Sequence, residues 1–380
     1  MVVLTAPTPR EVELRVTTSY SYLNSMPRLP LSEFLQGPAT APILDVRAPI
    51  EYEQGHIPGA LSLPLFTDEE RARIGTAYKQ VSQDRAVHIG LEFFGPKMSR
   101  VVKRAQKMAP DKEVRLHCWR GGMRSGAVLW LLELAGFRVH LLDKGYKDYR
   151  RWALAQFTEP RPMLILGGLT GSGKTDVLHE LARQGETIVD LEGLASHKGS
   201  SFGAIGLPPQ PTPEQFENNL ALELDALPTT VVPWLEDESL TIGRITIPKP
   251  FFETMRHAPL VVLDIPRAVR TRKLAAEYGK EDPQQLAEAI QRISKRLGGL
   301  ATKDALAAIE SGDMEQMVDI ALTYYDKTYG FGLDNKVNSR IVRVPSDTCD
   351  PVVNAGLVRE AVRREGLVEL AQSPAQHAGS

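Results

Sequence analysis

The chain has 380 residues, of which 42% are hydrophobic and 24% are charged, and its formal net charge is −2 at pH 7. This composition is ordinary for a soluble globular protein, and the length predicts two domains, since single cores stop growing at about 250–300 residues. It excludes a disulfide-rich secreted domain, because only Cys118 and Cys349 are present, and a membrane span, because no apolar run reaches about 20 residues; we therefore expect a cytoplasmic protein without membrane contact.

Strands and helices alternate in the first half of the chain, after a leader at residues 1–24 that has no clear pattern. The passage 51–65 predicts a helix, a turn and a strand. The other predicted strands are 43–49, 113–118 and 138–146, and the predicted helices are 125–136 and 148–157. Because such alternation is typical of a parallel sheet covered by helices, we predict an α/β domain at residues 25–157.

A second alternation begins after the proline-containing linker 158–162. Its predicted strands are 163–168, 187–191, 229–239, 258–266 and 340–346. Its predicted helices include 173–185, 267–279, 314–330 and 351–365. We therefore predict a second α/β domain at residues 158–370, followed by a flexible tail at 371–380.

The stretch HCWRGGMR, residues 117–124, lies between a predicted strand and a predicted helix. Its two glycines let the backbone turn several N–H groups toward one centre, and its two arginines and the helix N-terminus add positive charge. Such surroundings favour a thiolate, which is the nucleophilic form of cysteine. The predicted catalytic residues are Cys118, Arg120 and Arg124, and the predicted substrate-binding residues of the loop are Trp119, Gly121 and Gly122.

Two families use a cysteine loop of this kind. The spacing H-C-x5-R occurs in cysteine-dependent phosphatases, and the loop also resembles that of rhodaneses, in which the cysteine carries sulfur as a persulfide. The upstream LDVRAPIEYEQGHIPGALSLPL, residues 44–65, closely resembles a rhodanese motif, and DKGYKDYR, residues 143–150, resembles the closing element of that domain. We therefore predict a rhodanese-like domain, although some phosphatases share this fold and the fold alone does not exclude their chemistry.

The stretch GLTGSGKT, residues 168–175, fits the phosphate-binding pattern G-x-x-x-x-G-K-[ST] without a mismatch, after a predicted strand and before a predicted helix. Its backbone N–H groups would surround an oxyanion, its lysine would add charge, and its threonine could hold Mg²⁺. Asp264 and the acidic triplet 236–238 compete as the acidic strand end of a nucleotide hydrolase, but a P-loop accepts any diphosphate. The predicted phosphate-binding residues are Gly168, Gly171, Ser172, Gly173, Lys174 and Thr175.

Both motifs stand beside further distinctive segments. These are ERARIGTAYKQ at 70–80, which ordinary rhodaneses lack, SHKGSSFG at 196–203, FEN at 216–218, LEDESLTIGR at 235–244 and RISKRLGG at 292–299. The whole layout resembles the bacterial tRNA 2-selenouridine synthase family over nearly all of residues 31–364. This resemblance implies a rhodanese-like parallel-sheet domain followed by a P-loop NTPase-like α/β domain with a helical region.

The resemblance also implies a chemistry at the wobble uridine of tRNA. In that family the 2-thio group is S-geranylated from geranyl diphosphate, and selenophosphate then displaces geranylthiol. Both compounds are co-substrates, so we expect no permanently bound cofactor and no resident metal. A transient contact with a selenophosphate-producing enzyme is a further expectation. The resemblance assigns the essential cysteine to Cys118, and we predict further substrate contacts at His197, Ser200, Ser201, Glu236 and Asp237.

A tRNA partner requires cationic side chains that can follow a phosphate backbone. Two groups lie at helical spacing, although each is also what a solvated helix face would present. The predicted tRNA-binding residues are Arg267, Arg270, Arg272 and Lys273 in the first group and Arg292, Lys295 and Arg296 in the second. Two other functions stay open: a rhodanese-type sulfurtransferase fused to a nucleotide-hydrolysing P-loop enzyme, and an RNA-binding protein without catalysis.

Overall fold

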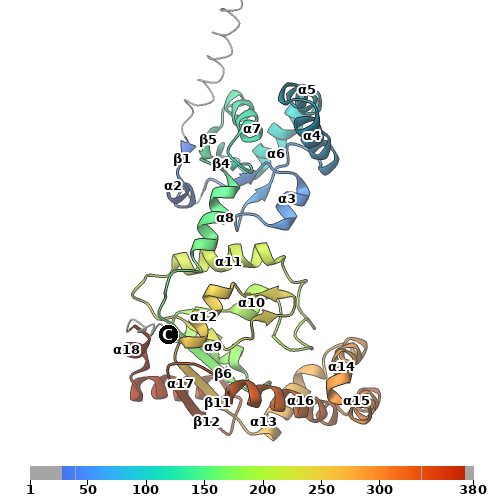
Figure 1. Ribbon diagram of the computed structural model, residues 1–380, viewed down its shortest axis with the longest axis vertical. Coiled ribbons are helices and arrows are strands. Elements are labelled where there is room, and N and C mark those ends of the chain that lie inside the picture. Colours follow the sequence, from blue (N-terminus) through green and yellow to red (C-terminus); the bar gives the residue numbers. More distant parts are fainter. Residues whose placement is uncertain (1–27, 39, 335, 373–380) are drawn as a thin grey trace, which may run out of the picture. The chain divides into compact units, whose positions relative to one another are not determined.

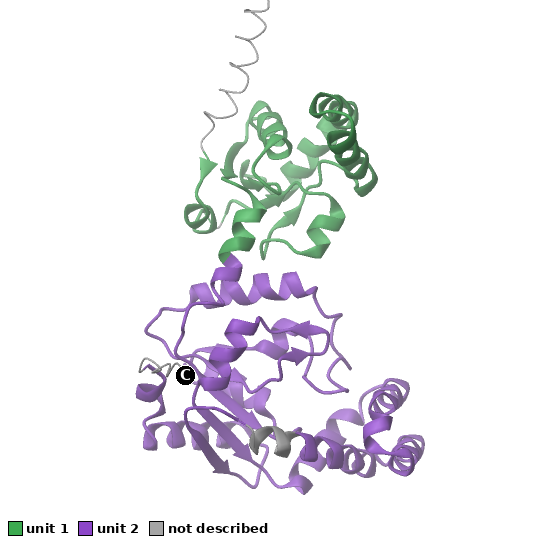
Figure 2. Ribbon diagram, viewed as in Figure 1, with its two compact units in different colours: residues 1–152 green, residues 153–380 purple. Residues whose placement is uncertain are grey.

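The computed structural model describes residues 28–38, 40–334 and 336–372. The chain divides into two compact units, 1–152 and 153–380, and helix α8 (Tyr146–Ala155) runs across the division (Figure 1, Figure 2). Each unit is an α/β fold with its own parallel sheet, which confirms the predicted fold class. The predicted leader 1–24 and residues 373–380 of the predicted tail lie outside the described residues, and the predicted domain border after residue 157 stays a prediction.

The sheet of the first unit has five parallel strands in the order β1-β5-β4-β2-β3. The strands are β1 (Arg28–Leu29), β2 (Ile43–Asp45), β3 (Leu61–Ser62), β4 (Glu113–His117) and β5 (Arg138–Leu142). The central strand, β4, pairs with β2 on one side and with β5 on the other. Chain connections therefore diverge at its carboxyl end, which is where ligands bind in open α/β sheets.

The helices of the first unit are α2 (Leu31–Leu35), α3 (Pro49–Gln54), α4 (Asp68–Gln80), α5 (Gln83–Phe94), α6 (Met98–Met108) and α7 (Met123–Leu134). A 3-10 turn, Gly95–Lys97, separates α5 from α6. Helices α4 and α5 pack against each other (Figure 1). The sequence pattern does not predict α4 as a helix, because Ala77 is its only buried residue and a clear apolar stripe is missing.

The second unit also has a parallel sheet with the phosphate-loop strand at its centre, in the order β12-β11-β6-β8-β7. Its strands are β6 (Leu164–Gly168), β7 (Ile188–Val189), β8 (Trp234–Glu236), β11 (Leu260–Asp264) and β12 (Ile341–Pro345). Helices α9 (Lys174–Arg183) and α17 (Pro351–Arg364) complete the core over this sheet. The strand β7 is shorter than predicted, because Asp190 caps the next helix and ends the strand.

The rest of the second unit is mainly helical. A short antiparallel hairpin joins β9 (Thr241–Ile242) to β10 (Ile245–Thr246). The further helices are α10 (Leu191–Ala195), α11 (Pro213–Ala226), α12 (Lys249–His257), α13 (Arg267–Tyr278), α14 (Pro283–Leu297), α15 (Gly299–Ser311), α16 (Met314–Asp334) and α18 (Leu367–Gln372). Helices α13 to α16 enclose a separate core (Figure 1). Within the described ranges, no helix has both the length and the apolar character needed to cross a membrane.

Candidate functional site

Cys118 lies directly after the central strand β4, in a loop that leads into α7. Its side chain is only 3% exposed. The sulfur lies 3.1 Å from Oγ of Ser125, and this hydroxyl lies 3.1 Å from the carbonyl oxygen of Gly122. The single Ser125 proton is donated to the Gly122 carbonyl when the thiol donates to Oγ, and rotation of the hydroxyl would turn it toward an ionised sulfur. Ser125 is thus a partner of the cysteine that the sequence analysis did not identify.

The turn between β5 and α8 holds the cysteine loop in place. The N–H of Tyr146 donates to the carbonyl of Cys118 at 2.8 Å, and the N–H of Lys147 donates to the carbonyl of Trp119 at 2.9 Å. Gly145 has φ 64°, and a Cβ atom there would lie 2.5 Å from the nitrogen of Gly121. The two backbones can approach this closely only because residue 145 is glycine.

Several buried polar side chains pack next to the cysteine loop. The Arg47 guanidinium donates to both carboxylate oxygens of Asp45, with distances of 2.6–3.0 Å, and its centre lies 3.7 Å from the ring centroid of Tyr146. His117 is also fully buried, and burial lowers its pKa while Asp45 acts in the opposite direction. Because these side chains have no access to solvent, they serve to position the loop.

The two predicted catalytic arginines have different surroundings. Arg124 donates to the Glu51 carboxylate at 2.7 Å. Although burial opposes its charge, the hydrogen bond to Glu51 raises the pKa of Arg124, and Cys118 adds to this effect. Arg120 is exposed and, among the described residues, has no hydrogen bond or ion pair. Arg120 is therefore free to reach an anionic ligand, whereas Arg124 is fixed beside the sulfur.

The phosphate loop joins β6 to α9 in the conformation that its glycines permit. Gly171 and Gly173 have φ 82° and 77°. A Cβ atom on Gly171 would lie 2.6 Å from Leu274, so a larger residue would disturb the contact with α13. The Lys174 ammonium donates to the carbonyl of Gly168 at 3.2 Å. Backbone N–H groups at the start of α9 and this lysine together form an anion cradle.

Carboxyl groups lie beside Thr175 of the phosphate loop. The Thr175 hydroxyl donates to Glu192 at 2.5 Å, and Glu238 is hydrogen-bonded to Glu192. Burial, followed by the charge of Glu192, raises the pKa of Glu238 to about 8, while Lys174 opposes this rise. Glu238 is therefore mostly protonated at neutral pH. The sequence analysis missed Glu192, although it and Glu238 follow strands whose carboxyl ends meet at one sheet edge.

Comparison with known proteins covers both parts of the chain. The sequence model of the family described as "tRNA 2-selenouridine synthase AAA domain" matches residues 161–356, and that of the "Rhodanese-like domain" matches residues 30–151. Three relatives carry the name tRNA 2-selenouridine synthase. The protein from Shewanella sediminis is 36% identical over 79% of this chain and 90% of its own, and that from Shewanella loihica is 38% identical over 82% and 92%. The protein from Salmonella newport is 37% identical over 81% of this chain and 93% of its own. The chain belongs to the tRNA 2-selenouridine synthase family.

Two of the predicted substrate contacts in this family member have other partners. Glu236 is completely buried, and its carboxylate accepts the N–H of Leu191 at 3.0 Å, so it holds the start of α10. Burial and the nearby acids Asp190 and Glu192 raise its pKa. Asp237 forms an ion pair with Lys336. The predicted contact by Glu236 is wrong, because its carboxyl group has no access to a ligand, whereas substrate contact by Asp237 stays a prediction.

The loop 196–203 is tied to the helical region of the second unit. Ser201 donates from its hydroxyl to the carbonyl of Ala289 at 3.0 Å and from its N–H to the hydroxyl of Tyr325 at 3.1 Å. The Ser200 hydroxyl accepts the N–H of Phe202 at 3.2 Å. His197 is buried and accepts the N–H of Gly199 at 3.1 Å. Substrate contact by His197, Ser200 and Ser201 stays a prediction.

The first predicted tRNA-binding group does not form one cationic face on α13. Arg270 is 2% exposed and donates twice to the Asp326 carboxylate, at 2.9 Å each, so burial removes it from any RNA surface. Arg267 and Lys273 form ion pairs at 2.7 Å with Asp319 and Asp176. Of this group, Arg272 is exposed and has no polar partner among the described residues.

The second predicted group lies on the exposed side of α14. Arg292 donates to the carbonyl of Ser201 at 2.8 Å, and Arg296 donates to the Tyr324 hydroxyl at 2.9 Å. Lys295 has no polar partner within the part of the chain that the structure describes. Within the described ranges none of the three is paired with an acid, so their charges stay available there, and tRNA binding by this face remains our prediction.

Proposed function

We propose that this chain is an enzyme that modifies tRNA and replaces the 2-thio sulfur of the wobble uridine by selenium. The relatives that carry the name tRNA 2-selenouridine synthase cover 79–82% of the chain. The observation that carries the proposal is the pairing of a cysteine loop and a diphosphate cradle, each placed after the central strand of its own sheet. A cytoplasmic location and a transient contact with a selenophosphate-producing enzyme stay predictions.

The first proposed step is S-geranylation. The sulfur of 2-thiouridine attacks C1 of geranyl diphosphate, the C1–O bond breaks, pyrophosphate leaves with the electron pair, and the N3 proton is lost. The backbone N–H groups before α9 and the Lys174 ammonium would stabilise the departing pyrophosphate. Alkylation has a clear purpose, because it converts the sulfur into a good leaving group.

A magnesium ion would neutralise part of the diphosphate charge. The hydroxyl of Thr175 is the oxygen donor that fits this ion, since Mg²⁺ prefers oxygen ligands and keeps several waters. Among the described residues, no group of three or more acidic, histidine or cysteine side chains is arranged to hold a metal by itself. Substrate phosphates would therefore supply the other ligands.

The second proposed step is selenation at the cysteine loop. The selenium of selenophosphate attacks C2 of the base, the C2–S bond breaks, geranylthiol leaves, and water cleaves the Se–P bond to give phosphate. Arg120 and the backbone N–H groups of the loop would bind the phosphoryl oxygens. Cys118 either carries selenium transiently or positions selenophosphate, and Ser125 would orient its sulfur in both cases.

Mass spectrometry of nucleosides tests the two assignments separately. A tRNA with 2-thiouridine is incubated with the full-length protein and geranyl diphosphate, and then with selenophosphate. We expect Lys174→Ala to lower S-geranylation at least about 100-fold, since it removes the main charge on pyrophosphate. We expect Cys118→Ser to accumulate S-geranyl nucleoside and to lose selenouridine. Normal geranylation by Lys174→Ala, with selenation alone abolished, would remove the P-loop assignment.

The same preparations distinguish the alternative function. ATP hydrolysis that depends on Lys174 and responds neither to tRNA nor to prenyl diphosphate would indicate a nucleotide-hydrolysing enzyme fused to a sulfurtransferase. Unchanged selenouridine formation by Cys118→Ser would remove the catalytic assignment of the cysteine loop.

A further inference from the structure

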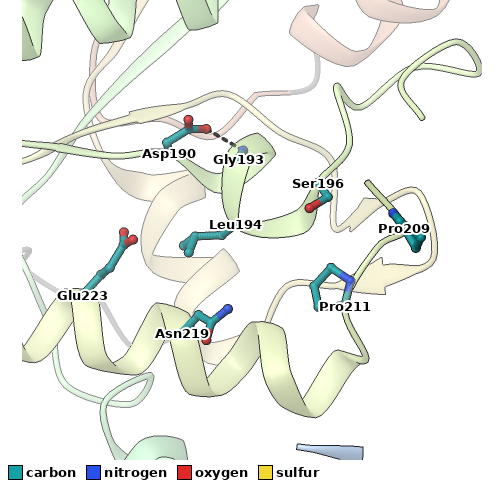
Figure 3. A pocket seen from close by; sticks show the side chains of 8 residues that line it. All are labelled: Asp190, Gly193, Leu194, Ser196, Pro209, Pro211, Asn219 and Glu223. Atoms are coloured by element: carbon teal, nitrogen blue, oxygen red, sulfur yellow. Dashed lines mark hydrogen bonds between the residues drawn. The ribbon is translucent and has the colours of Figure 1, made fainter. Parts of the chain in front are cut away.

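The second unit contains a pocket of about 370 Å³ between α10 and α11, which is a size typical of small-molecule sites (Figure 3). It is lined by Asp190, Gly193, Leu194, Ser196, Pro209, Pro211, Asn219 and Glu223. None of the residues that the motif analysis assigned to a site lines it. The chemistry of its walls indicates what it could bind.

The pocket is joined to the phosphate loop through α9. Thr175 and His179 lie one helical turn apart on α9 and therefore on the same face. Thr175 donates to Glu192 at 2.5 Å, and Nε2 of His179 lies 2.7 Å from the Asp190 carboxylate. Both acids belong to the turn and first residues of α10, whose Gly193 and Leu194 form a wall of the pocket. The cradle for the diphosphate and the pocket thus share α10 as a common wall.

The lining combines apolar surfaces with hydrogen-bonding groups. Leu194, Pro209 and Pro211 offer apolar contacts for the faces of a flat ring. The Asn219 side-chain oxygen accepts from Gln215 at 2.8 Å, which leaves its amide N–H groups to donate into the pocket, where Figure 3 shows the nitrogen. A ligand with a carbonyl oxygen would satisfy this donor.

The lining has two acids, Asp190 and Glu223, and they differ in their partners. Among the described residues Glu223 has no hydrogen bond or ion pair, and its side chain is exposed. Loss of hydration around its carboxyl group, and then the negative charge of Asp190, raise its pKa. Asp190 differs, because its carboxylate already accepts the N–H of Gly193 at 2.6 Å and contacts His179. Glu223 is therefore the carboxylate of this lining that is free to accept a proton from a ligand.

The charge of the lining excludes an anionic ligand. It contains two carboxylates and no lysine or arginine, so both charged side chains would repel a phosphate or a second diphosphate. A neutral ring with an N–H donor beside a carbonyl group fits the donors and acceptors present. The Watson–Crick edge of a 2-thiouracil base has this pattern, with N3–H next to the C4 carbonyl.

We propose that this pocket holds the 2-thiouracil base during S-alkylation and that Glu223 is the general base that accepts its N3 proton. The inference rests on the proposed function and deepens its first step. The base sulfur forms a bond to C1 of the prenyl group, the C1–O bond breaks, and pyrophosphate leaves toward the P-loop. The electrons of the N3–H bond restore a neutral ring, and the proton passes to the Glu223 carboxylate. The Asn219 amide donates to the C4 carbonyl and fixes the orientation of the base.

The test compares Glu223→Gln with Asp225→Asn in the full-length protein. Asp225 is exposed on the same helix and does not line the pocket, so it controls for loss of a charge on α11. The probe is a 2-thiouridine-containing anticodon stem-loop with geranyl diphosphate, and the readout is the S-geranyl nucleoside. We expect Glu223→Gln to lower the alkylation rate by about 10²–10⁴-fold and Asp225→Asn to change it less than about 2-fold.

Two further measurements separate a base from a structural role. The deficit of Glu223→Gln should shrink as pH rises, because hydroxide then removes the N3 proton in solution. Selenation of a stem-loop that is already S-geranylated should be unchanged, since that substrate has no N3 proton. A pH-independent deficit, or an equal loss in both steps, would overturn the assignment of Glu223 as a base.

The failure of this inference can be told from failure of the proposed function. Rapid alkylation by both wild type and Glu223→Gln removes only the base assignment. Formation of selenouridine by the wild type without any S-geranyl intermediate removes the alkylation route, and the base assignment falls with it.

Discussion

At the cysteine loop, the Glu51 carboxylate holds the Arg124 guanidinium in place and favours its charged form. Glu51 lies on α3 and accepts from Arg124 at 2.7 Å, while Arg71 contacts the same carboxylate at 3.0 Å. Burial is the largest single influence on Glu51 and opposes its ionisation. The hydrogen bond and charge of Arg124, the N–H of Ala48 and the charge of Arg71 together outweigh burial, so the net effect lowers the pKa of Glu51. The pair keeps a positive charge beside Cys118 without occupying Arg120, which can therefore approach a ligand.

This pair predicts a pH-dependent contribution to stability. The folded-state pKa of Glu51 lies below its ordinary value of 4.5, so its stabilisation is present above about pH 4.5 and is lost as pH falls through the folded value. We expect Glu51→Gln to lower the unfolding free energy by about 1–2 kcal/mol at pH 7 and by less at pH 4. Urea unfolding at both pH values measures this. Glu53→Gln, at an exposed position of α3, is the control, and a difference that grows toward acid would contradict the prediction.

At the scale of elements, the segment between β5 and α8 connects them and also holds the cysteine loop in place. Directly after this segment, the N–H groups of Tyr146 and Lys147 at the start of α8 donate to the carbonyls of Cys118 and Trp119 and so fix the backbone of the loop. The close approach leaves no room for a side chain at Gly145. The conformation of the anion-binding loop therefore depends on an element that follows it in the chain.

The substitution Gly145→Ala tests the contact between this segment and the cysteine loop, and a control glycine accounts for the cost of a positive φ alone. A Cβ atom at residue 145 would meet the carbonyl of Cys118 and would lie 2.8 Å from the nitrogen of Arg120. We expect a loss of about 2–4 kcal/mol in the unfolding free energy of the first unit and a strong loss of selenation, with geranylation retained. Chemical denaturation and nucleoside mass spectrometry measure these effects.

Gly59→Ala is the matched control for that substitution. Gly59 also has a positive φ, 78°, but a Cβ atom there would meet nothing within 4 Å. Its replacement should cost about 1 kcal/mol and leave selenation unchanged, because only the backbone conformation is penalised. Equal effects of the two substitutions would show that contact with the cysteine loop is unimportant.

At the scale of the whole molecule, the two reactions are assigned to separate units. Each unit has its own sheet and core, and in each the central strand leads into the anion-binding loop. Under the proposed function, one polypeptide would combine a module for leaving-group activation with a module for displacement.

Separate units predict complementation between defective proteins. Neither Cys118→Ser nor Lys174→Ala should form selenouridine alone, but a mixture of the two should, because S-geranyl tRNA is a stable molecule that can dissociate and rebind. We expect the yield to rise with the concentration of Lys174→Ala protein, which supplies the intact cysteine loop. Nucleoside mass spectrometry of the mixture is the measurement. No selenouridine at any ratio would mean that the intermediate never leaves the protein.

The sequence by itself was sufficient for the fold class and for locating the two glycine-rich loops that each join a central strand to a helix. These rest on local information: a buried strand, a glycine-rich loop and a helix follow one another within a few residues at both Cys118 and Lys174. Helix α4 escaped prediction because it lacks such local information: it has only one buried residue, and its apolar pattern is too weak to recognise.

Only the tertiary structure decided which charges are paired and which are free. Glu51 and Arg124 are 73 residues apart in the chain, Arg270 and Asp326 are 56 apart, and Thr175 and Glu192 are 17 apart. Helical spacing predicted Arg270 as an exposed cation, yet burial against Asp326 removes it from the surface. The pocket with Glu223 likewise forms from α10 and α11 together with the loop that precedes α11. Pairing and burial depend on contacts between distant segments, and no local pattern in the chain encodes them.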